Sequence, residues 1–273
     1  MNRRAAIFSI LSLGLVSLSA TAAGPIPDAA LEAAVREVLH FPTGELNDEK
    51  LKGVFVLEAQ KKGIKSLVGL EKCPNLALLR VNNNQIVDLK PIAGAANLQS
   101  LDVSGNKVKD LTPVAGLIKL QYLELSNNEV EKIDALAGLP ALTSLYLTGN
   151  KIADASPAAK LTKLWSLHLG KNLLKDIAPL AALTKLSTLE IRENQIADIS
   201  AIGKMTELSL LMMDKNKVTD LTPLVKSAEA DAAGPKRFAP YLRLYLGGNP
   251  LSDAAKKDQL AALKKIGVRV FEE

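Results

Sequence analysis

The residue types of a hydrolytic triad occur close together in this sequence, as Ser166, His168 and Glu190. The serine and histidine are two positions apart, and on a strand such residues lie about 6.6 Å apart with parallel side chains. A nucleophile and its base must instead be within about 3 Å of each other, beside donors that stabilise an oxyanion. No glycine-rich or pocket-forming stretch supplies those donors. We therefore predict no catalytic residue and no enzymatic activity.

Residues for metal or redox chemistry are few. The histidines His40 and His168 are far apart in the sequence, whereas a zinc site needs several ligands together. A column of aspartates offers calcium ligands, but capping of turns by aspartate explains that column more simply. The single cysteine, Cys73, can form no internal disulfide and is expected to be a small buried residue. We predict no metal and no cofactor. The aspartates are Asp88, Asp110, Asp154, Asp176, Asp198 and Asp220.

An asparagine recurs every 22 residues through most of the chain. Each one ends a pattern such as Leu-x-x-Leu-x-Val-x-x-Asn, which runs from Leu98 to Asn106. A period of about 20–29 residues with this pattern is typical of a leucine-rich-repeat solenoid. The series comprises Asn84, Asn106, Asn128, Asn150, Asn172, Asn194 and Asn216.

The repeat predicts one strand and one turn in each coil. Leu101 and Val103 alternate with polar residues, as on a strand with one buried face. One coil cannot bury that face alone, so coils must stack and align their strands in a parallel sheet. Asn106 falls at the turn after the strand, where its amide can pair with backbone groups. Asp110 and Pro113 suit a short capped turn on the opposite, convex side. The predicted fold class is therefore α/β, a solenoid with a curved parallel sheet.

The outward strand positions define a concave face that neighbouring coils share. Tyrosine, tryptophan, methionine and arginine are enriched at protein interfaces. Isolated surface aromatics need no function, but a surface shared between coils favours binding. We predict a protein-binding site formed by Tyr122, Glu124, Tyr146, Trp165, His168, Glu190, Met212 and Tyr245. Four residues before each asparagine position stand Glu58, Arg80, Asp102, Glu124, Tyr146, His168, Glu190, Met212 and Tyr245.

Residues 1–23 have the layout of a secretory signal peptide. Arg3 and Arg4 precede an apolar run, and small residues follow at its end. We predict cleavage near Ala22 or Ala23 and a secreted or periplasmic protein. A membrane anchor is the alternative, but the run is short and interrupted by serines. The arginine pair also matches twin-arginine export weakly.

The charge of the chain argues against nucleic acid. With 34 basic and 29 acidic residues the formal charge is +5, and without Arg3 and Arg4 the balance is 32 against 29, or +3. So small an excess does not favour nucleic acid or membrane, and carboxylates on the concave face would repel phosphate. No stretch after residue 23 is long enough to span a bilayer. We expect a monomer with a protein partner, no nucleic acid and no membrane span.

Four segments divide the chain. After the signal peptide, residues 24–53 form a predicted N-terminal cap, with an amphipathic helix from Pro27 to Leu39 capped by Asp28 and a short helix from Asn47 to Leu51. Residues 54–250 contain about nine coils. Residues 251–273 form a C-terminal cap, with a helix over 252–266 and a strand over 268–271.

One coil is longer than the others. From Asn216 to the next asparagine, Asn249, there are 33 residues, which is 11 more than the repeat. The extra residues fall in the segment 225–240, whose composition is that of a loop. Long surface insertions are tolerated thermodynamically. We therefore expect a neutral surface loop here, with a role in binding as the less favoured alternative.

Two motifs and the repeat length resemble a known family. The motifs are Asp28-x-x-Leu31-Glu32-Ala33-Ala34-x-Arg36 and Gly63-Ile64-x-x-Leu67-x-Gly69-Leu70-Glu71, followed by coils of 22 residues. The chain is similar to the secreted bacterial leucine-rich-repeat proteins of the internalin type over nearly the whole mature length. The resemblance implies a binding protein, in several members an adhesin, that uses its concave sheet.

Two classes of function follow from these observations. The first is an exported, non-enzymatic protein-binding module that recognises its partner on the concave face. The second is an envelope scaffold, or an adhesin-like protein, without one specific partner. A pull-down that compares the mature protein with a concave-face variant would distinguish them.

Overall fold

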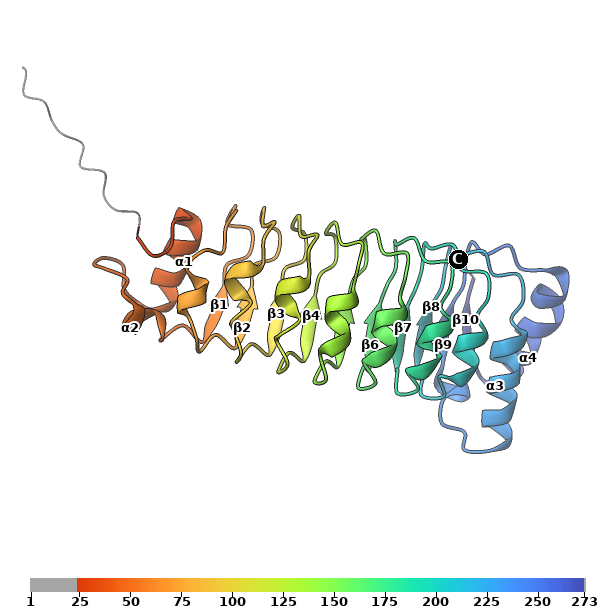
Figure 1. The fold of residues 1–273 in the computed structure, drawn as a ribbon. Coiled ribbons are helices and arrows are strands. Elements are labelled where there is room, and N and C mark those ends of the chain that lie inside the picture. Colours follow the sequence, from red (N-terminus) through yellow and green to blue (C-terminus); the bar gives the residue numbers. More distant parts are fainter. Residues whose placement is uncertain (1–23, 273) are drawn as a thin grey trace, which may run out of the picture.

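One long parallel sheet runs the length of the molecule in the computed structural model, which describes residues 24–272 (Figure 1). Within that range, ten short strands pair in chain order, each with the next, so that the stacked coils form an open, curved solenoid. The signal-peptide prediction lies outside the described residues. The strands are β1 (Val56–Glu58), β2 (Leu78–Arg80), β3 (Ser100–Asp102), β4 (Tyr122–Glu124), β5 (Ser144–Tyr146), β6 (Ser166–His168), β7 (Thr188–Glu190), β8 (Leu210–Met212), β9 (Arg243–Tyr245) and β10 (Arg269–Phe271).

The strands have the alternation that the sequence predicts. The central residue of each strand from β1 to β9 is buried, as Leu123 and Leu145 are in β4 and β5. The residues on either side of it lie on the concave face, and all of them except Glu190 are at least partly exposed. The register joins equivalent positions, with Leu123 opposite Leu145. The core is accordingly a column of leucine, isoleucine and valine side chains that continues from coil to coil.

The asparagine ladder is confirmed. From Asn84 to Asn216, each asparagine of the 22-residue series is buried at the turn after its strand. Asn150 accepts a hydrogen bond from the Val130 N–H at 3.0 Å and donates to the carbonyls of Leu125 and Leu147 at 3.0 and 2.9 Å. Each amide thus links two neighbouring coils and satisfies backbone groups that would otherwise be buried without partners.

Short helical turns form the convex side, opposite the sheet (Figure 1). Five of them follow an aspartate whose carboxylate accepts a hydrogen bond from the N–H two residues ahead; Asp110 Oδ1, for example, accepts one from the Thr112 N–H at 2.8 Å. Pro113 is the second residue of the helical turn that follows, where no N–H donor is required. The turns are η1 (Leu70–Lys72), η2 (Lys90–Ile92), η3 (Thr112–Val114), η4 (Asp134–Gly138), η5 (Ser156–Lys160), η6 (Ala178–Ala182) and η7 (Ser200–Lys204). Two further segments, η8 (Ala239–Tyr241) and the π-helical η9 (Ala255–Gln259), lie nearer the C-terminus.

Two helices precede the first coil, as predicted. Helix α1 (Ala29–Val38) begins after Asp28, whose Oδ1 accepts hydrogen bonds from the N–H groups of Ala30 and Leu31 at 3.1 and 3.0 Å. The other carboxylate oxygen accepts from the Lys65 N–H at 2.8 Å, which ties the helix to the first coil. Helix α2 (Asp48–Leu51) follows. Together they cover the core at the β1 end of the sheet.

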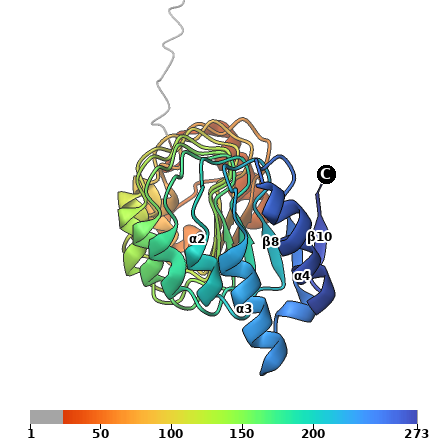
Figure 2. The same cartoon turned by 90° about the vertical axis from the view of Figure 1, so that its right-hand side faces the viewer.

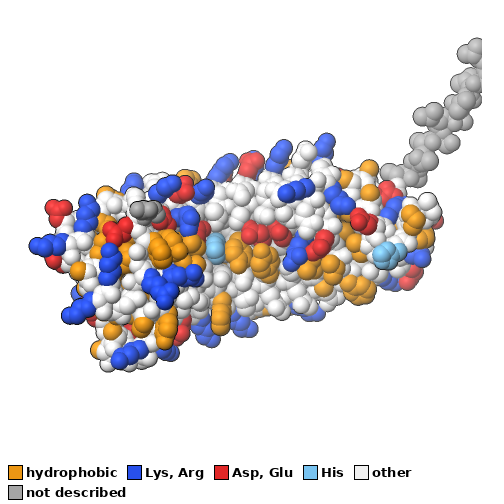
Figure 3. Space-filling view, turned by 180° about the vertical axis from the view of Figure 1, so that it is seen from behind, with side chains coloured by type: hydrophobic (Ala, Val, Ile, Leu, Met, Phe, Trp, Pro, Cys, Tyr) orange, Lys and Arg blue, Asp and Glu red, His pale blue; other side chains and the backbone are white. Residues whose placement is uncertain are grey.

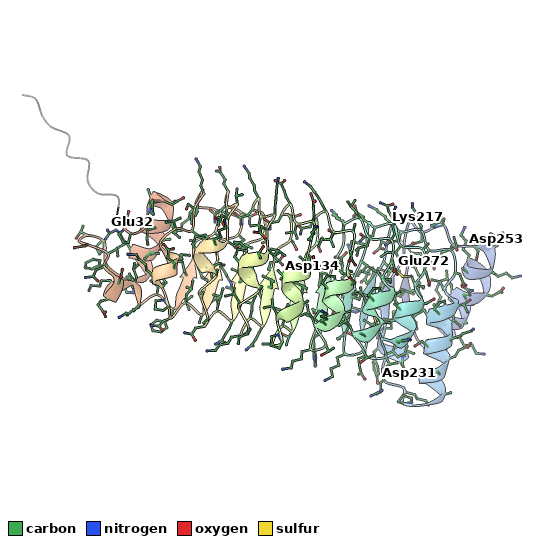
Figure 4. The ribbon with its side chains drawn as sticks, viewed as in Figure 1. Glu32, Asp134, Lys217, Asp231, Asp253 and Glu272 are labelled. Atoms are coloured by element: carbon green, nitrogen blue, oxygen red, sulfur yellow. The ribbon has the colours of Figure 1, made fainter. Side chains whose placement is uncertain are left out.

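Residues 225–233 of the insertion are helical, so the prediction of a surface loop was wrong for that part. Helix α3 (Thr222–Ala233) replaces the short convex turn of this coil. Four of its last six residues are alanines. The high helix propensity of alanine outweighs the lower propensity of the polar residues between them. Figure 4 shows Asp231 near the end of the helix, where its buried carboxylate accepts hydrogen bonds from the N–H groups of Arg237, Phe238 and Ala239 at 2.9–3.1 Å. Since Phe238 is buried as well, the loop that follows α3 is anchored.

A second helix lies beside α3 at the C-terminal end (Figure 2). The predicted helix over 252–266 is built from η9 and helix α4 (Leu260–Ile266), and it ends at Gly267 with φ +108°. Glycine adopts this left-handed conformation without steric cost, which is why it terminates helices. Strand β10 follows directly and pairs with β9.

Candidate functional site

Three aromatic side chains form a row on the concave face. Tyr122, Tyr146 and His168 come from the adjacent strands β4, β5 and β6, and Tyr146 lies directly opposite His168 in the register. The ring centroids are 5.4 Å apart for the two tyrosines and 4.6 Å apart for Tyr146 and His168. Such tilted pairs are attractive beyond the apolar area that they bury. The row is half-buried, so part of each ring is open to a partner.

Two carboxylates lie beside this aromatic row. Asp102 and Glu124 are opposite each other on β3 and β4. Each turns back to accept a hydrogen bond from a backbone N–H two residues ahead, and Glu124 Oε1 is 2.8 Å from the Ser126 nitrogen. Burial raises the pKa of Glu124, and burial together with these carboxylates raises the pKa of Tyr122 to about 12. At neutral pH the Tyr122 hydroxyl therefore remains protonated and available as a donor.

The strand pattern predicts Glu190 as an outward charge beside the aromatic row. In the structure this carboxylate is not exposed. Its side chain folds onto the sheet, and the residue is only 4% exposed. Its Oε2 accepts hydrogen bonds from the Thr148 hydroxyl at 2.9 Å and from the Gly170 N–H at 3.0 Å. A Cβ atom on Gly170 would lie 2.1 Å from Glu190 Oε1. The missing side chain at Gly170 is what makes room for this carboxylate.

Arg192 is a charged residue of this face that the sequence analysis missed. Its Nε lies 3.2 Å from Glu190 Oε1 and 4.0 Å from Asp214 Oδ2, so the guanidinium compensates two carboxylates without an aligned hydrogen bond from Nε. Gly170, Arg192 and Asp214 all stand two residues before a ladder asparagine. These outward positions lie two residues beyond the column that contains Glu190, and an arginine there is the signal by which Arg192 could have been found.

His168 forms no hydrogen bond with the charged side chains of Glu190, Arg192 and Asp214. Its Nδ1 is 4.0 Å from Glu190 Oε2, which is beyond hydrogen-bonding distance. Burial, and then the positive charge of Arg192, lower the pKa of His168, so the imidazole is neutral at pH 7. Among residues 24–272 the Ser166 hydroxyl forms no hydrogen bond with it. Ser166, His168 and Glu190 thus lack the contacts of a triad.

The other three predicted residues lie apart from the aromatic row. The sulfur of Met212 is 2.7 Å from Arg192 Nη2. Tyr245 stacks on Phe271 with ring centroids 4.3 Å apart and planes at 9°. Phe271 was not predicted to belong to this face, because the C-terminal coil departs from the 22-residue period. Trp165 is 63% exposed and lines a separate groove of about 570 Å³ before β6 and β7.

The glycine beneath Glu190 gives a testable expectation. Gly170→Ala should lower the free energy of unfolding by about 1 kcal/mol, because the new methyl group displaces the carboxylate from its hydrogen bonds. In a Glu190→Ala background the same change should be neutral, or stabilising by about 0.4–1 kcal/mol, since Gly170 has no left-handed φ. Chemical denaturation of the four proteins completes the double-mutant cycle.

Gly138→Ala is the control, because a Cβ there meets nothing within 4 Å. Equal effects of Gly170→Ala with and without Glu190 would show that the carboxylate does not occupy this space.

Comparison with known proteins agrees with the fold. The models of two families match, Leucine rich repeat at residues 96–152 and Leucine Rich repeats (2 copies) at residues 140–182. No curated protein matches the chain. The sheet, the asparagine ladder and these matches define a leucine-rich-repeat protein.

Solved structures show which type of leucine-rich-repeat protein this chain resembles. Internalin C2 of Listeria monocytogenes is 35% identical, with 73% of this chain and 89% of that one covered and a TM-score of 0.71. Internalin F of the same organism is 30% identical, with 93% and 78% covered and a TM-score of 0.71. The chain belongs to the internalin-type leucine-rich-repeat proteins of bacteria. The functional domain of InlJ from L. monocytogenes shares the fold at 22% identity, with 88% and 53% covered and a TM-score of 0.63.

Proposed function

We propose that this chain is an exported, non-enzymatic module that binds a protein partner on the concave face of coils β4 to β9. The observation that carries the proposal is the aromatic row of Tyr122, Tyr146 and His168, stacked across three strands yet partly open. Tyrosine offers apolar area with a polar tip and loses little side-chain entropy on binding. Residues of this kind carry a large share of the energy at protein interfaces.

Charge beside the aromatic row favours a basic region on the partner. The carboxylates of Asp102 and Glu124 accept hydrogen bonds from their own backbone, and no ion pair within residues 24–272 neutralises either. Glu190 is different, because Arg192 lies against it. The negative potential of the face is therefore concentrated at β3 and β4.

The geometry also supports a binding role over catalysis. Reaction of a serine nucleophile requires a base within about 3 Å and an oxyanion site. His168 is neutral but has no such contact with Ser166, and its approach to Glu190 is 4.0 Å. In the described part of the chain, no helix has the length and apolarity needed to cross a membrane.

Affinity capture tests this function against the scaffold alternative. Purified wild-type protein, Tyr146→Ala and Lys175→Ala are immobilised and exposed to bacterial culture medium and cell extracts, and the retained proteins are identified by mass spectrometry. A specific partner should be retained by wild type and by Lys175→Ala, which changes an exposed residue of the convex side. It should be lost from Tyr146→Ala. Identical sets on all three proteins would favour an envelope scaffold without one partner.

Export of the protein can be tested separately from partner binding. The arrangement of residues 1–23 and the secreted internalin type both favour removal of the signal peptide in transit. Intact-mass measurement of the protein from its native source should find a start near Ala23 or Gly24. A cytoplasmic protein that retains Met1 would contradict the proposed localisation.

A further inference from the structure

A row of uncommitted hydroxyl groups crosses the centre of the concave face. Ser144, Ser166 and Thr188 are opposite one another on β5, β6 and β7. All three are half-buried, and none of their side-chain hydroxyls takes part in a hydrogen bond within residues 24–272. Each can both donate and accept. The row therefore offers unused hydrogen-bonding groups at the spacing of adjacent strands, roughly 4.8 Å.

Larger side chains border this hydroxyl row on both sides. Two residues further along the same strands stand Tyr146 and His168, which belong to the aromatic row. On the other side, Trp165 directly precedes Ser166 and is 63% exposed. Its groove is also lined by Arg237, from the anchored loop after α3. The hydroxyl row is thus a strip of small side chains between larger ones, where a backbone can approach the sheet closely. We call this strip of Ser144, Ser166 and Thr188 the trough.

The two ends of the trough carry opposite charge. At β4 the line begins with Tyr122, beside Glu124 and Asp102. Beyond Thr188 it continues through Leu210 to Arg243 and Arg269 on β9 and β10.

Both arginines are exposed, and neither forms an ion pair in the described part of the chain. Figure 3 shows the same polarity, with acidic side chains near the middle of this face and basic ones gathered toward its C-terminal end.

We infer that the trough binds an extended peptide segment of the partner, with a basic residue toward β4 and an acidic residue toward β9. The inference rests on the proposed function and deepens it. Five strand steps separate β4 from β9, or roughly 24 Å, which an extended chain spans with about seven residues. The hydroxyl floor hydrogen-bonds the main chain of the segment, and the charged ends fix its direction.

Selection from a random peptide library tests directly whether the trough binds a peptide with this order of charges. Twelve-residue peptides displayed on phage are selected on the purified protein, and the enriched sequences are compared. The selected peptides should carry a basic and an acidic residue about five to seven positions apart, always in the same order. Failure to enrich any peptide, or enrichment without this charge order, would overturn the inference.

Variants of the floor and of the basic end sharpen the test. Ser166→Phe, which fills the trough, should weaken binding of a selected peptide at least about tenfold, in the range of a lost interface anchor. Selection on Arg243→Glu should no longer return the acidic residue. Thr219→Phe is the matched control, because it enlarges an exposed hydroxyl residue outside the sheet and should leave binding unchanged. Unaltered peptide binding by Ser166→Phe would contradict a site in the trough.

Capture of the protein partner by the three variants distinguishes the proposed function from the inference of a bound peptide segment. If Tyr146→Ala abolishes capture while Ser166→Phe and Arg243→Glu leave it intact, the concave face binds a partner but not through this trough. If Tyr146→Ala leaves capture intact, the proposed function itself fails. Loss of capture in all three variants, with normal unfolding midpoints, supports both.

Discussion

Replacement of Asn150 by alanine is expected to lower the free energy of unfolding by about 1–3 kcal/mol. The change removes the hydrogen-bond acceptor of the Val130 N–H and the donors to the Leu125 and Leu147 carbonyls. All three backbone groups are buried, so water cannot replace the lost amide without opening the turn. Denaturation in urea, followed by circular dichroism, should record a lower midpoint.

Asn97→Ala is the matched control. The side chain of Asn97 also bonds a backbone carbonyl, that of Pro74 at 3.0 Å, but it does so at the surface. Its replacement should change the stability by no more than about 0.5 kcal/mol. An unchanged midpoint for Asn150→Ala would mean that the ladder does not hold neighbouring coils together.

The repeating part of the fold was predictable because one physical constraint recurs in every coil. A strand with a single apolar face has to stack, and the turn after it needs an amide at the position of Asn106 or Asn150. The N-terminal helix was likewise predictable from Asp28, whose carboxylate caps it. These features depend on local sequence and on a period that can be counted.

The insertion escaped prediction because it interrupts that period. A polar, alanine-containing stretch suits a surface helix as well as a loop, and the choice depends on what anchors its end. Here the anchor is Asp231, which binds three backbone N–H groups beyond the helix. The partners of that carboxylate lie 6 to 8 residues away and have no pattern that marks them in advance.

The candidate site was predicted in part. Alternation along the strands places Tyr122, Tyr146 and His168 on one face, and the structure brings them together. Alternation also places Glu190 outward, yet the side chain is buried because Gly170, two residues after the neighbouring strand ends, leaves a space. Such an effect depends on two residues 20 positions apart, so a single strand pattern cannot reveal it.

Replacement of Tyr146 by alanine is expected to weaken partner binding by about 2 kcal/mol, or roughly 30-fold in Kd. Tyr146 is the central member of the aromatic row and contacts both Tyr122 and His168, so its loss removes one anchor and loosens the other two. The stability of the protein should fall less, by about 0.5–1.5 kcal/mol, the worth of its aromatic contacts. Thermal unfolding of both proteins checks that the variant is folded at the temperature of the binding experiment.

Titration of the captured partner by isothermal calorimetry is the most direct measurement of the central claim, that the aromatic row on the concave face is the binding site. Wild type, Tyr146→Ala and the convex-side variant Lys175→Ala are compared at one temperature and one salt concentration. We expect wild type and Lys175→Ala to bind with the same Kd, and Tyr146→Ala to bind roughly 30-fold more weakly. Equal affinity for Tyr146→Ala and wild type, with weaker binding by Lys175→Ala, would place the site on the opposite side of the solenoid.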